Sequence, residues 1–180
     1  MDGMVVTDTT GNSLECFQGI GEAAALIAKR ARTGYKILFI GNGASAAISS
    51  HMATDFWKNG GIRALAFNDG VLLTCMGNDY GYEQVFAKPI QMFADPGDML
   101  MAISSSGQSP NILLGVRAAR QKGCQVITLS GFKPDNPLRS LGDYNFYVPA
   151  STYGTVEILH HSICHCLLDM IDQRKLIKSS

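Results

Sequence analysis

The feature that most constrains the fold is a regular alternation of short apolar runs with helix-length segments. The apolar runs lie at residues 35–40, 62–67, 96–104, 124–130 and 144–150. The segments between them have the apolar spacing of helices, which we expect over 44–57, 71–94 and 109–123. Pro89 must either kink the second of these or lie near a helix N-terminus. Strands that are apolar throughout are buried on both faces, and helical crossovers make them parallel. The sequence therefore predicts an α/β fold, a single doubly wound five-stranded parallel sheet with helices on both faces, like the three-layer sandwich of flavodoxin.

The chain is predicted to form one domain over residues 1–180. No internal repeat or low-complexity segment divides it, and 180 residues suffice for one complete hydrophobic core. We expect an N-terminal helix over about 13–33 with Ser13 as its cap, the sheet and its helices over about 35–150, and a closing helix over about 154–174. The first helix carries a single narrow apolar stripe, which suits packing against another helix.

Charge and hydropathy exclude several classes of function. Lys and Arg number 15 and Asp and Glu number 15, so nothing favours binding to nucleic acid or to an anionic membrane. No apolar run approaches the roughly 20 residues of a membrane helix, and the N-terminus lacks the pattern of a signal peptide. Charged residues make up only 17% of the chain and the mean hydropathy is +0.08, which favours a surface buried between subunits.

The cysteines indicate a reducing compartment. There are five of them, and none forms a Cys-x-x-Cys pair. An odd number without that spacing is unlike a disulfide framework. We therefore expect a cytoplasmic protein.

A serine-rich loop, ISSSGQS at residues 103–109, follows the third predicted strand. Its hydroxyls are those of Ser104, Ser105, Ser106 and Ser109. Together with the free N–H groups of a helix that can begin at Pro110, they form a neutral cradle for a phosphate monoester. The alternative is a helix cap, but a cap needs one serine rather than four. Because the loop has no lysine of the kind that a triphosphate site uses, a sugar phosphate is favoured over a nucleotide.

Two further turns are polar. The run GNGAS at residues 41–45 presents backbone N–H groups at a helix start, which suits an anion or a polar ligand. It is neither a Walker A loop nor a Gly-x-Gly-x-x-Gly fingerprint, and a purely geometric role in a tight turn is an equal alternative. The run NDYGY at residues 78–82 is, by itself, typical of an ordinary loop.

All four histidines lie on two predicted helices. His51 and Asp55 stand four residues apart and therefore share one helix face. The closing helix carries Glu157, His160, His161 and His165. A buried structural histidine is the ordinary alternative, but three imidazoles so close together beside a glutamate favour metal ligation or acid–base chemistry.

Together these motifs resemble the SIS (sugar isomerase) domain family, and within it the phosphoheptose isomerases. The matching runs are GNGASAAISSHMATDF, GNDYGY, ISSSGQSPN, KGCQVITLSG and VEILHHSICH. The resemblance implies an enzyme, an aldose–ketose isomerase that converts sedoheptulose 7-phosphate to D-glycero-D-manno-heptose 7-phosphate for lipopolysaccharide or capsule. It also implies zinc, no nucleotide or redox cofactor, and a homo-oligomer, most simply a tetramer, with active sites at its interfaces.

The resemblance also implies roles for individual residues. The phosphate would be held by Ser104, Ser105, Ser106 and Ser109. The sugar would be lined by Asn42, Gly43, Ala44, Asn78 and Asp79. The zinc ligands would be His51, Asp55, Glu157 and His165, and the catalytic groups would be Asp55, Glu157 and His165. The family usually has glutamate, glutamine and asparagine where this chain has Asp55, Glu157 and Gln108, so the identity of the catalytic base stays open.

An isomerase of this kind moves a proton between adjacent carbons through an enediol, which requires a carboxylate base and a group that serves the carbonyl oxygen. Glu157 and His165 are about 12 Å of helical rise apart, whereas zinc ligands lie about 2 Å from the ion. Either only one of them binds a given ion, or a neighbouring subunit supplies the other. We expect the two substitutions relative to the family, Asp55 for glutamate and Glu157 for glutamine, to be coupled. Glu157 would then act as the base, or as an anionic ligand, where the shorter Asp55 no longer reaches.

Two other functions stay open. One is an isomerase that acts on a different sugar phosphate. The other is a non-catalytic SIS protein that binds a sugar phosphate and regulates or scaffolds a protein partner such as a replication initiator. Such a protein would keep the serine loop but would not need His51, His165 and two carboxylates.

Overall fold

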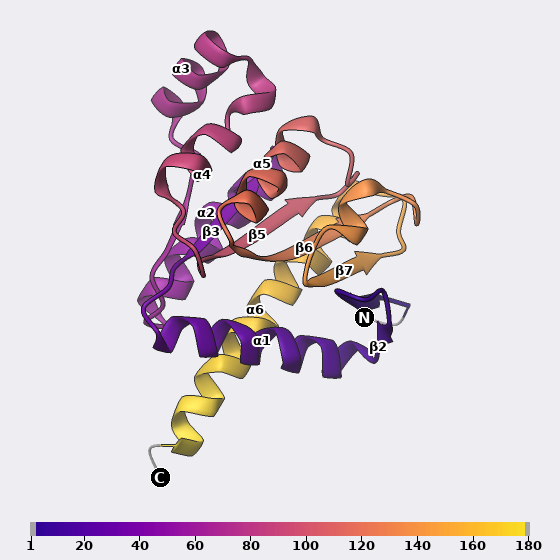
Figure 1. Ribbon diagram of the computed structural model, residues 1–180. Helices are drawn as coiled ribbons and strands as arrows, with labels where there is room; N and C mark the ends of the chain where they lie inside the picture. Colours follow the sequence, from indigo (N-terminus) through magenta and orange to yellow (C-terminus); the bar gives the residue numbers. More distant parts are fainter. Residues whose placement is uncertain (1–2, 179–180) are drawn as a thin grey trace.

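The structure, a computed structural model, describes residues 3–178, with side chains to residue 172. Its strands within that range are β1 (Val5–Asp8), β2 (Ser13–Leu14), β3 (Ile37–Gly41), β4 (Ala64–Ala66), β5 (Met99–Ser104), β6 (Gln125–Gly131) and β7 (Tyr144–Val148). In this described part of the chain they form one seven-stranded sheet in the order β2-β1-β7-β6-β5-β3-β4 (Figure 1). The five strands predicted from the sequence, β3 to β7, are all present and pair in parallel, which confirms the α/β class.

The N-terminal hairpin is an addition that the sequence analysis missed. Strands β1 and β2 pair antiparallel, and β1 also pairs antiparallel with β7, so the sheet is mixed. Only Val6 of β1 is buried, so the local apolar pattern is too weak to mark a strand. The hairpin forms because the outer edge of β7 offers its backbone groups for pairing.

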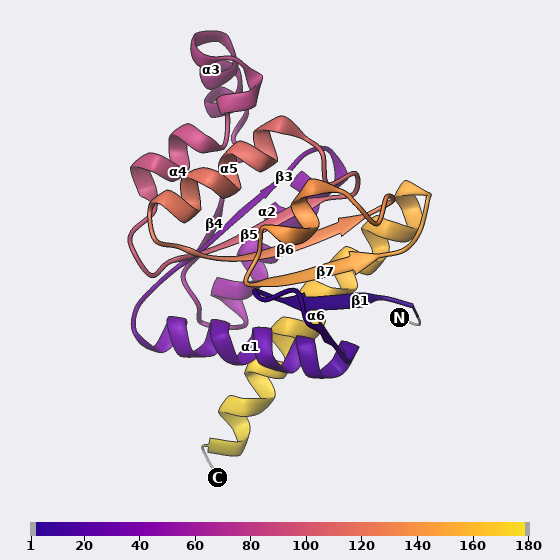
Figure 2. The same cartoon turned by 45° about the vertical axis from the view of Figure 1, so that its right-hand side comes forward.

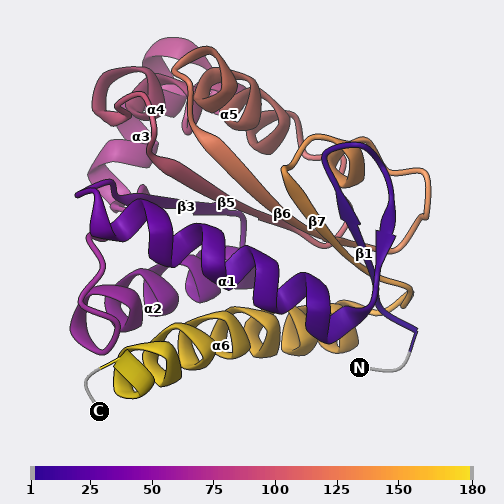
Figure 3. The same cartoon turned by 60° about the horizontal axis from the view of Figure 1, so that its bottom comes forward.

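The helices are α1 (Cys16–Arg32), α2 (Ala44–Lys58), α3 (Gly70–Tyr80), α4 (Ala87–Phe93), α5 (Pro110–Gln121) and α6 (Tyr153–Lys178), with short 3-10 turns at η1 (Tyr82–Gln84) and η2 (Pro137–Ser140). Helices α1, α2 and α6 cover one face of the sheet, and α4 and α5 cover the other (Figure 3). A buried hydrophobic cluster lies on each side of the sheet. The expected sandwich of three layers is therefore confirmed.

Two details of the first helix differ from expectation. Ser13 belongs to β2, and the cap of α1 is Glu15, whose carboxylate accepts a hydrogen bond from the Gln18 N–H at 3.0 Å. Ile20 on the predicted stripe is buried, but Phe17 is 69% exposed. The stripe packs against α6 because both helices lie on the same face of the sheet (Figure 3).

The helical segment predicted over 71–94 is divided into α3, η1 and α4, and of the two positions expected for Pro89 the structure has the one near a helix N-terminus. Gly81 ends α3, and Pro89 lies in the first turn of α4, where its missing N–H does no harm. Helix α3 lies at the end of the molecule, where Leu72, Leu73 and Met76 pack against the core cluster, but none of its residues, all of them described, is fully buried (Figure 2).

The register of the parallel strands brings the predicted loops together. Gly41 at the end of β3 pairs with Ile103 of β5, and Ser104 at the end of β5 pairs with Ser130 of β6. The glycine turn and the serine loop therefore leave the sheet side by side at its carboxyl edge, the usual position of ligand sites in such sheets. No helix in the described part of the chain has the length and apolar character needed to cross a membrane.

Candidate functional site

A cavity of about 130 Å³ opens at the carboxyl end of β5. All four serines of the predicted phosphate loop line it, together with Asn42, Tyr153 and Glu157. Tyr153, whose ring meets that of Phe132 edge to face at 4.9 Å, was missed by the sequence analysis because nothing in its local pattern marks it. The cavity is smaller than a typical ligand pocket, so this chain encloses only part of a ligand here.

The serine hydroxyls are not used to cap the following helix. Ser109 occupies the cap position of α5, but its side chain makes no capping hydrogen bond. Ser106 Oγ accepts a hydrogen bond from the Gln108 N–H at 3.3 Å. Ser105 Oγ is buried and finds no hydrogen-bond partner among the residues that the structure describes. A buried hydroxyl without a partner is costly unless a ligand satisfies it, which favours binding over capping.

The serine loop is held in shape from below by Asn136, which the sequence analysis also missed. The Asn136 amide is buried and donates hydrogen bonds to Gly131 O at 3.2 Å and to Lys133 O at 2.8 Å. Gly107, at the apex of the loop, packs directly against Asn136 and has φ +62°. Its carbonyl accepts a hydrogen bond from the Leu138 N–H at 3.1 Å, so the η2 segment and the loop support each other.

The glycine turn contributes mainly structure. The side chains of Asn42 and Asn111 exchange two hydrogen bonds, each 2.9 Å long, and so tie the end of β3 to the start of α5. Tyr82 Oη also donates to Asn42 Oδ1, at 3.3 Å. Gly43 is the N-terminal cap residue of α2 and Ala44 is its first residue. Of the predicted sugar-binding residues in this turn, Asn42 thus reaches the serine cavity and Ala44 lines a neighbouring one.

Asn78 and Asp79 lie elsewhere. Both are exposed near the end of α3, where Asn78 Nδ2 donates to Asp79 Oδ1 at 2.9 Å. Neither lines the serine cavity within the described part of this chain. Their predicted contact with the sugar is therefore not assembled by one chain alone.

Three histidines converge between α2 and α6. One nitrogen from each of His51, His161 and His165 lies within 4.8 Å of the others, so the group has the donors to hold a metal ion. The Nε2 atoms of His161 and His165 are 3.1 Å apart. Asp55 Oδ2 lies 3.3 Å from His51 Nε2. Burial lowers the pKa of His161, and the neighbouring charges of His165 and His51 lower it further.

His161 was not among the predicted site residues, although its spacing could have revealed it. Glu157, His161 and His165 recur every four residues on α6 and so share one helix face. Of the four predicted metal ligands, the structure brings His51 and His165 together, and Asp55 lies beside His51 without belonging to the converging group of described residues. Within the described residues, the converging group includes His161 rather than Glu157.

His160 is a structural histidine. It is fully buried, its Nε2–H donates to the Ser130 carbonyl at 3.1 Å, and burial lowers its pKa to about 4. At neutral pH it is therefore uncharged and supports the strand that lies beneath the serine loop. The ordinary alternative is thus correct for this one of the three histidines on the closing helix.

Glu157 lies between the serine loop and the histidine cluster. It lines the serine cavity and also a second cavity of about 350 Å³, whose lining includes His51, His161 and Ile158. A carboxylate in this position can accept a proton from a ligand whose phosphate lies among the serines. The arrangement combines an anion cradle, a base and a group of imidazoles at one edge of the sheet.

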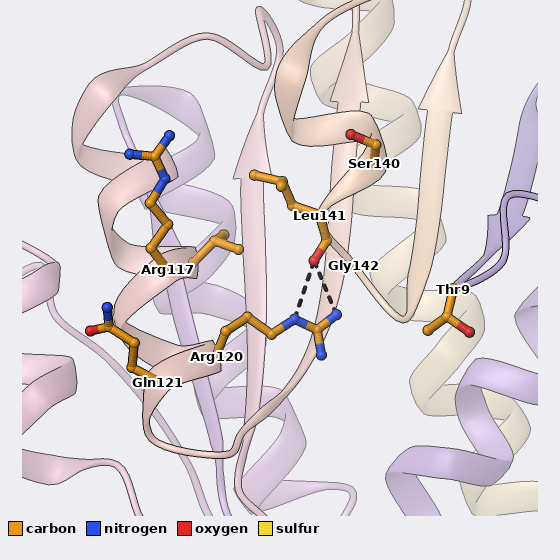
Figure 4. Close-up of a pocket in the computed structure, with 8 residues that line it drawn as sticks. Thr9, Arg117, Arg120, Gln121, Ser140, Leu141 and Gly142 are labelled. Atoms are coloured by element: carbon orange, nitrogen blue, oxygen red, sulfur yellow. Dashed lines mark hydrogen bonds between the residues drawn. The ribbon is translucent and has the colours of Figure 1, made fainter.

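A hollow of about 490 Å³ at the other edge of the sheet, near the starts of β6 and β7, is not part of this arrangement (Figure 4). Arg120 on its wall is already engaged, since its Nε and Nη2 donate to Leu141 O and its Nη1 pairs with Asp143 at 2.8 Å. The wall contains no imidazole or carboxylate among the described residues and none of the predicted site residues. Its size alone therefore does not make it the site.

Comparison with known proteins agrees with this geometry. Residues 10–131 match the family model described as SIS domain. The phosphoheptose isomerase of Solidesulfovibrio magneticus is 40% identical over 159 residues, which cover 85% of this chain and 77% of the relative. That of Nitratidesulfovibrio vulgaris is 39% identical over 157 residues, which cover 84% of this chain and 75% of the relative.

Solved structures give the same result. The phosphoheptose isomerase GmhA of Neisseria gonorrhoeae has a TM-score of 0.81 at 33% identity, and the match covers 86% of each chain. A phosphoheptose isomerase from Francisella tularensis has a TM-score of 0.77 at 31% identity, covering 87% of this chain and 86% of the other.

Proposed function

The chain belongs to the SIS domain family and, within it, to the phosphoheptose isomerases, and from that premise we propose that it isomerises a sugar phosphate between its ketose and aldose forms. The proposed reaction is the conversion of sedoheptulose 7-phosphate to D-glycero-D-manno-heptose 7-phosphate. The observation that carries the proposal is the position of Glu157, which lines both the serine cavity and the cavity beside the histidines.

The serine loop binds the phosphate in this proposal. Its hydroxyls provide donors without a fixed positive charge, and Ser105 Oγ has no partner among the described residues until a ligand provides one. The start of α5 adds the favourable end of a helix dipole. A phosphate anchored there leaves the sugar carbons to extend past Glu157 toward the histidines.

The Glu157 carboxylate acts as the base. It removes the proton from the carbon beside the carbonyl, which gives an enediol, and returns that proton to the neighbouring carbon. His165, on the same face of α6, serves the substrate oxygens, and its imidazole would exchange a proton with them when it holds no ion. Hydrogen moves only within the substrate, so the reaction requires no nucleotide or redox cofactor.

Zinc fits the histidine cluster, because zinc prefers imidazole nitrogen in four-coordinate sites. When bound, it polarises the substrate oxygens and stabilises negative charge on them. His51 and His165 are the predicted ligands that the structure brings together. Asp55, 3.3 Å from His51 Nε2, orients that imidazole, as carboxylates commonly do for metal-binding histidines.

The serine cradle can be tested by replacing two hydroxyls at once. The Ser106→Ala/Ser109→Ala variant should bind sedoheptulose 7-phosphate at least about 100-fold more weakly, because each hydrogen bond to a charged group contributes about 1.5–3 kcal/mol. Calorimetric titration measures the affinity, and Ser140→Ala, outside the cavity, is the matched control that should bind normally. A double variant with unchanged affinity rules the cradle out.

The activity is tested by assaying the wild-type protein with a panel of ketose phosphates of five to seven carbons. Turnover of the seven-carbon substrate, with much slower turnover of the shorter ones, is the expected result. Preference for another ketose phosphate of the panel would support the isomerase activity but would contradict the proposed seven-carbon substrate. No turnover of any ketose phosphate by protein loaded with zinc would reject the isomerase.

We also propose a homo-oligomer, most simply a tetramer, in which α3 contacts a second copy. Helix α3 carries apolar residues but buries none of its described side chains, and Val71 on it is 77% exposed. The same helix carries Asn78 and Asp79, which one chain does not bring to the serine cavity. Contact through α3 would remove its apolar surface from water and place these two residues at an interface.

Val71→Glu should weaken this assembly, because it places a charge in the proposed contact. Light scattering at several protein concentrations should show a shift toward smaller species together with lost activity. Gln121→Glu adds the same charge at an exposed position at the end of α5 and should leave the assembly intact. A wild-type monomer with full activity would contradict the proposal.

We place the enzyme in a reducing cytoplasm, where its product would supply heptose for lipopolysaccharide or capsule. The support for the compartment is the five cysteines without a Cys-x-x-Cys pair. The support for a heptose product is the name, phosphoheptose isomerase, that the two relatives described above share. Fractionation of the source cells tests the compartment.

A further inference from the structure

We infer that His161 is a metal ligand, and that it completes with His51 and His165 a site of three imidazoles from which Glu157 is excluded. This inference rests on the metal site proposed above and changes its composition. The ligand set expected from the sequence contained Glu157 and lacked His161. The ligand set matters for the proposed reaction, because the Glu157 carboxylate is a stronger base when it is free than when it is bound to a metal ion.

The three imidazoles converge from two helices. His161 and His165 lie one turn apart on α6, and His51 reaches them from α2, with its ring centroid 5.1 Å from that of His161 and 5.6 Å from that of His165. Two nitrogens that each bind zinc at about 2.0–2.1 Å in a tetrahedral site are separated by about 3.3–3.4 Å. The Nε2 atoms of His161 and His165 are 3.1 Å apart, so small side-chain rotations suffice to bind an ion.

A packing role alone does not account for this arrangement. Two neutral imidazoles can share one hydrogen bond, as His161 and His165 do, and His51 Nε2 pairs with Asp55 at 3.3 Å. These two pairs do not require a nitrogen of all three rings to lie within 4.8 Å of the others. None of the three is fully buried, since His51 is exposed and His161 and His165 are half-buried. His160, by contrast, is fully buried, and its Nε2–H donates to the Ser130 carbonyl.

The inference also removes a difficulty of spacing. Glu157 and His165 are about 12 Å of helical rise apart, so both side chains would have to extend toward each other to share one ion. His161 and His165 are separated by about 6 Å of rise, and their side chains already meet. One chain therefore supplies three nitrogens from its own residues, and Glu157 stays with the serine cavity.

Three imidazoles define the class of metal. They suit zinc and its neighbours cobalt, nickel and copper, and they disfavour magnesium, calcium and manganese, which prefer oxygen ligands. Three protein ligands also leave a fourth tetrahedral position open, as in catalytic zinc sites. The cavity beside the cluster is lined by His51, His161 and Glu157.

The test compares His161→Gln with Glu157→Ala in the full chain, because alanine removes every donor atom at position 157. Zinc content after dialysis and zinc affinity by competition with a chelator are measured first. Each protein is then titrated with Co²⁺, whose visible absorption reports tetrahedral nitrogen ligation. We expect His161→Gln to lower zinc affinity at least about 100-fold and to abolish the tetrahedral cobalt spectrum. We expect Glu157→Ala to keep both as in the wild type.

Ser162→Ala, the adjacent position on α6, is the control and should bind both metals normally. Far-ultraviolet circular dichroism and the Tm of the metal-free proteins show whether each variant folds; should His161→Gln fail to fold, His161→Asn takes its place. Unchanged zinc affinity in the His161 variant, or a loss in the Glu157 variant as large as that expected for His161, overturns the inference. So does a wild-type chain that binds neither metal.

The two proposals fail separately. A protein that binds zinc through His161 but turns over no ketose phosphate contradicts the isomerase and leaves the metal site standing. A protein that isomerises its substrate with unchanged zinc affinity in His161→Gln contradicts the metal site alone.

Discussion

Glu157→Gln should lower kcat for sugar-phosphate isomerisation by about 10²- to 10⁴-fold, the usual contribution of a general base. The amide matches the carboxylate in shape but accepts no proton at neutral pH. Because Glu157 lines both the serine cavity and the cavity beside the histidines, its loss should interrupt proton transfer while the phosphate still binds. Substrate affinity, measured by calorimetry, should change by less than about tenfold.

Exchange of the substrate's carbon-bound hydrogen with solvent deuterium separates this role from others. Glu157→Gln should stop the exchange. Asp55→Asn is the matched control, since it makes the same chemical change on the facing helix α2. Because Asp55 holds His51, its loss should weaken metal binding first and slow the exchange less. A Glu157→Gln enzyme with undiminished exchange, beside an inactive Asp55→Asn enzyme, would assign the base to Asp55.

Gly107→Ala should destabilise the protein and weaken phosphate binding together. Gly107 has φ +62°, a conformation that costs a residue with a side chain about 1–2 kcal/mol. A Cβ added there would overlap Asn136 Oδ1, and displacing that well-packed amide costs about 1–3 kcal/mol more. We expect the Tm to fall by roughly 5–15 °C and sugar-phosphate affinity to fall at least about tenfold.

Gly34→Ala separates the two causes. Gly34 also has a positive φ, +85°, but a Cβ there would meet nothing within 4 Å. This variant should show only the smaller backbone effect on Tm, and it should bind sugar phosphate normally. Differential scanning calorimetry and calorimetric titration provide the two measurements. Equal loss of affinity in both variants would show that Gly107 does not support the cradle through Asn136.

The fold was predictable because its signals are local. β3 is apolar along its whole length and β5 is apolar up to its last residue, Ser104, and every residue of both is buried. Such runs identify strands of a covered parallel sheet before any pairing is known. β1 gave no comparable signal, since Val6 alone is buried and the strand depends on the edge of β7.

The candidate site was predictable to the extent that one loop contains it. The serine loop carries its hydroxyls within a few residues, so the sequence alone indicated an anion cradle. The roles of the histidines could not be assigned from the sequence in the same way. His160 and His161 are neighbours in the chain, but a turn of about 100° on the helix sends one into the core and the other to His51.

The amino-acid sequence by itself determined the α/β class, the five parallel strands and the clustering of hydroxyls in the serine loop, because each follows from residues close together in the chain. Only the tertiary structure decided that Asn136 supports Gly107, that His161 joins His51 and His165, and that Glu157 lies between two cavities. Contacts between segments about 30 to 110 residues apart depend on how helices pack on the sheet. Packing is set by the whole core rather than by any local pattern.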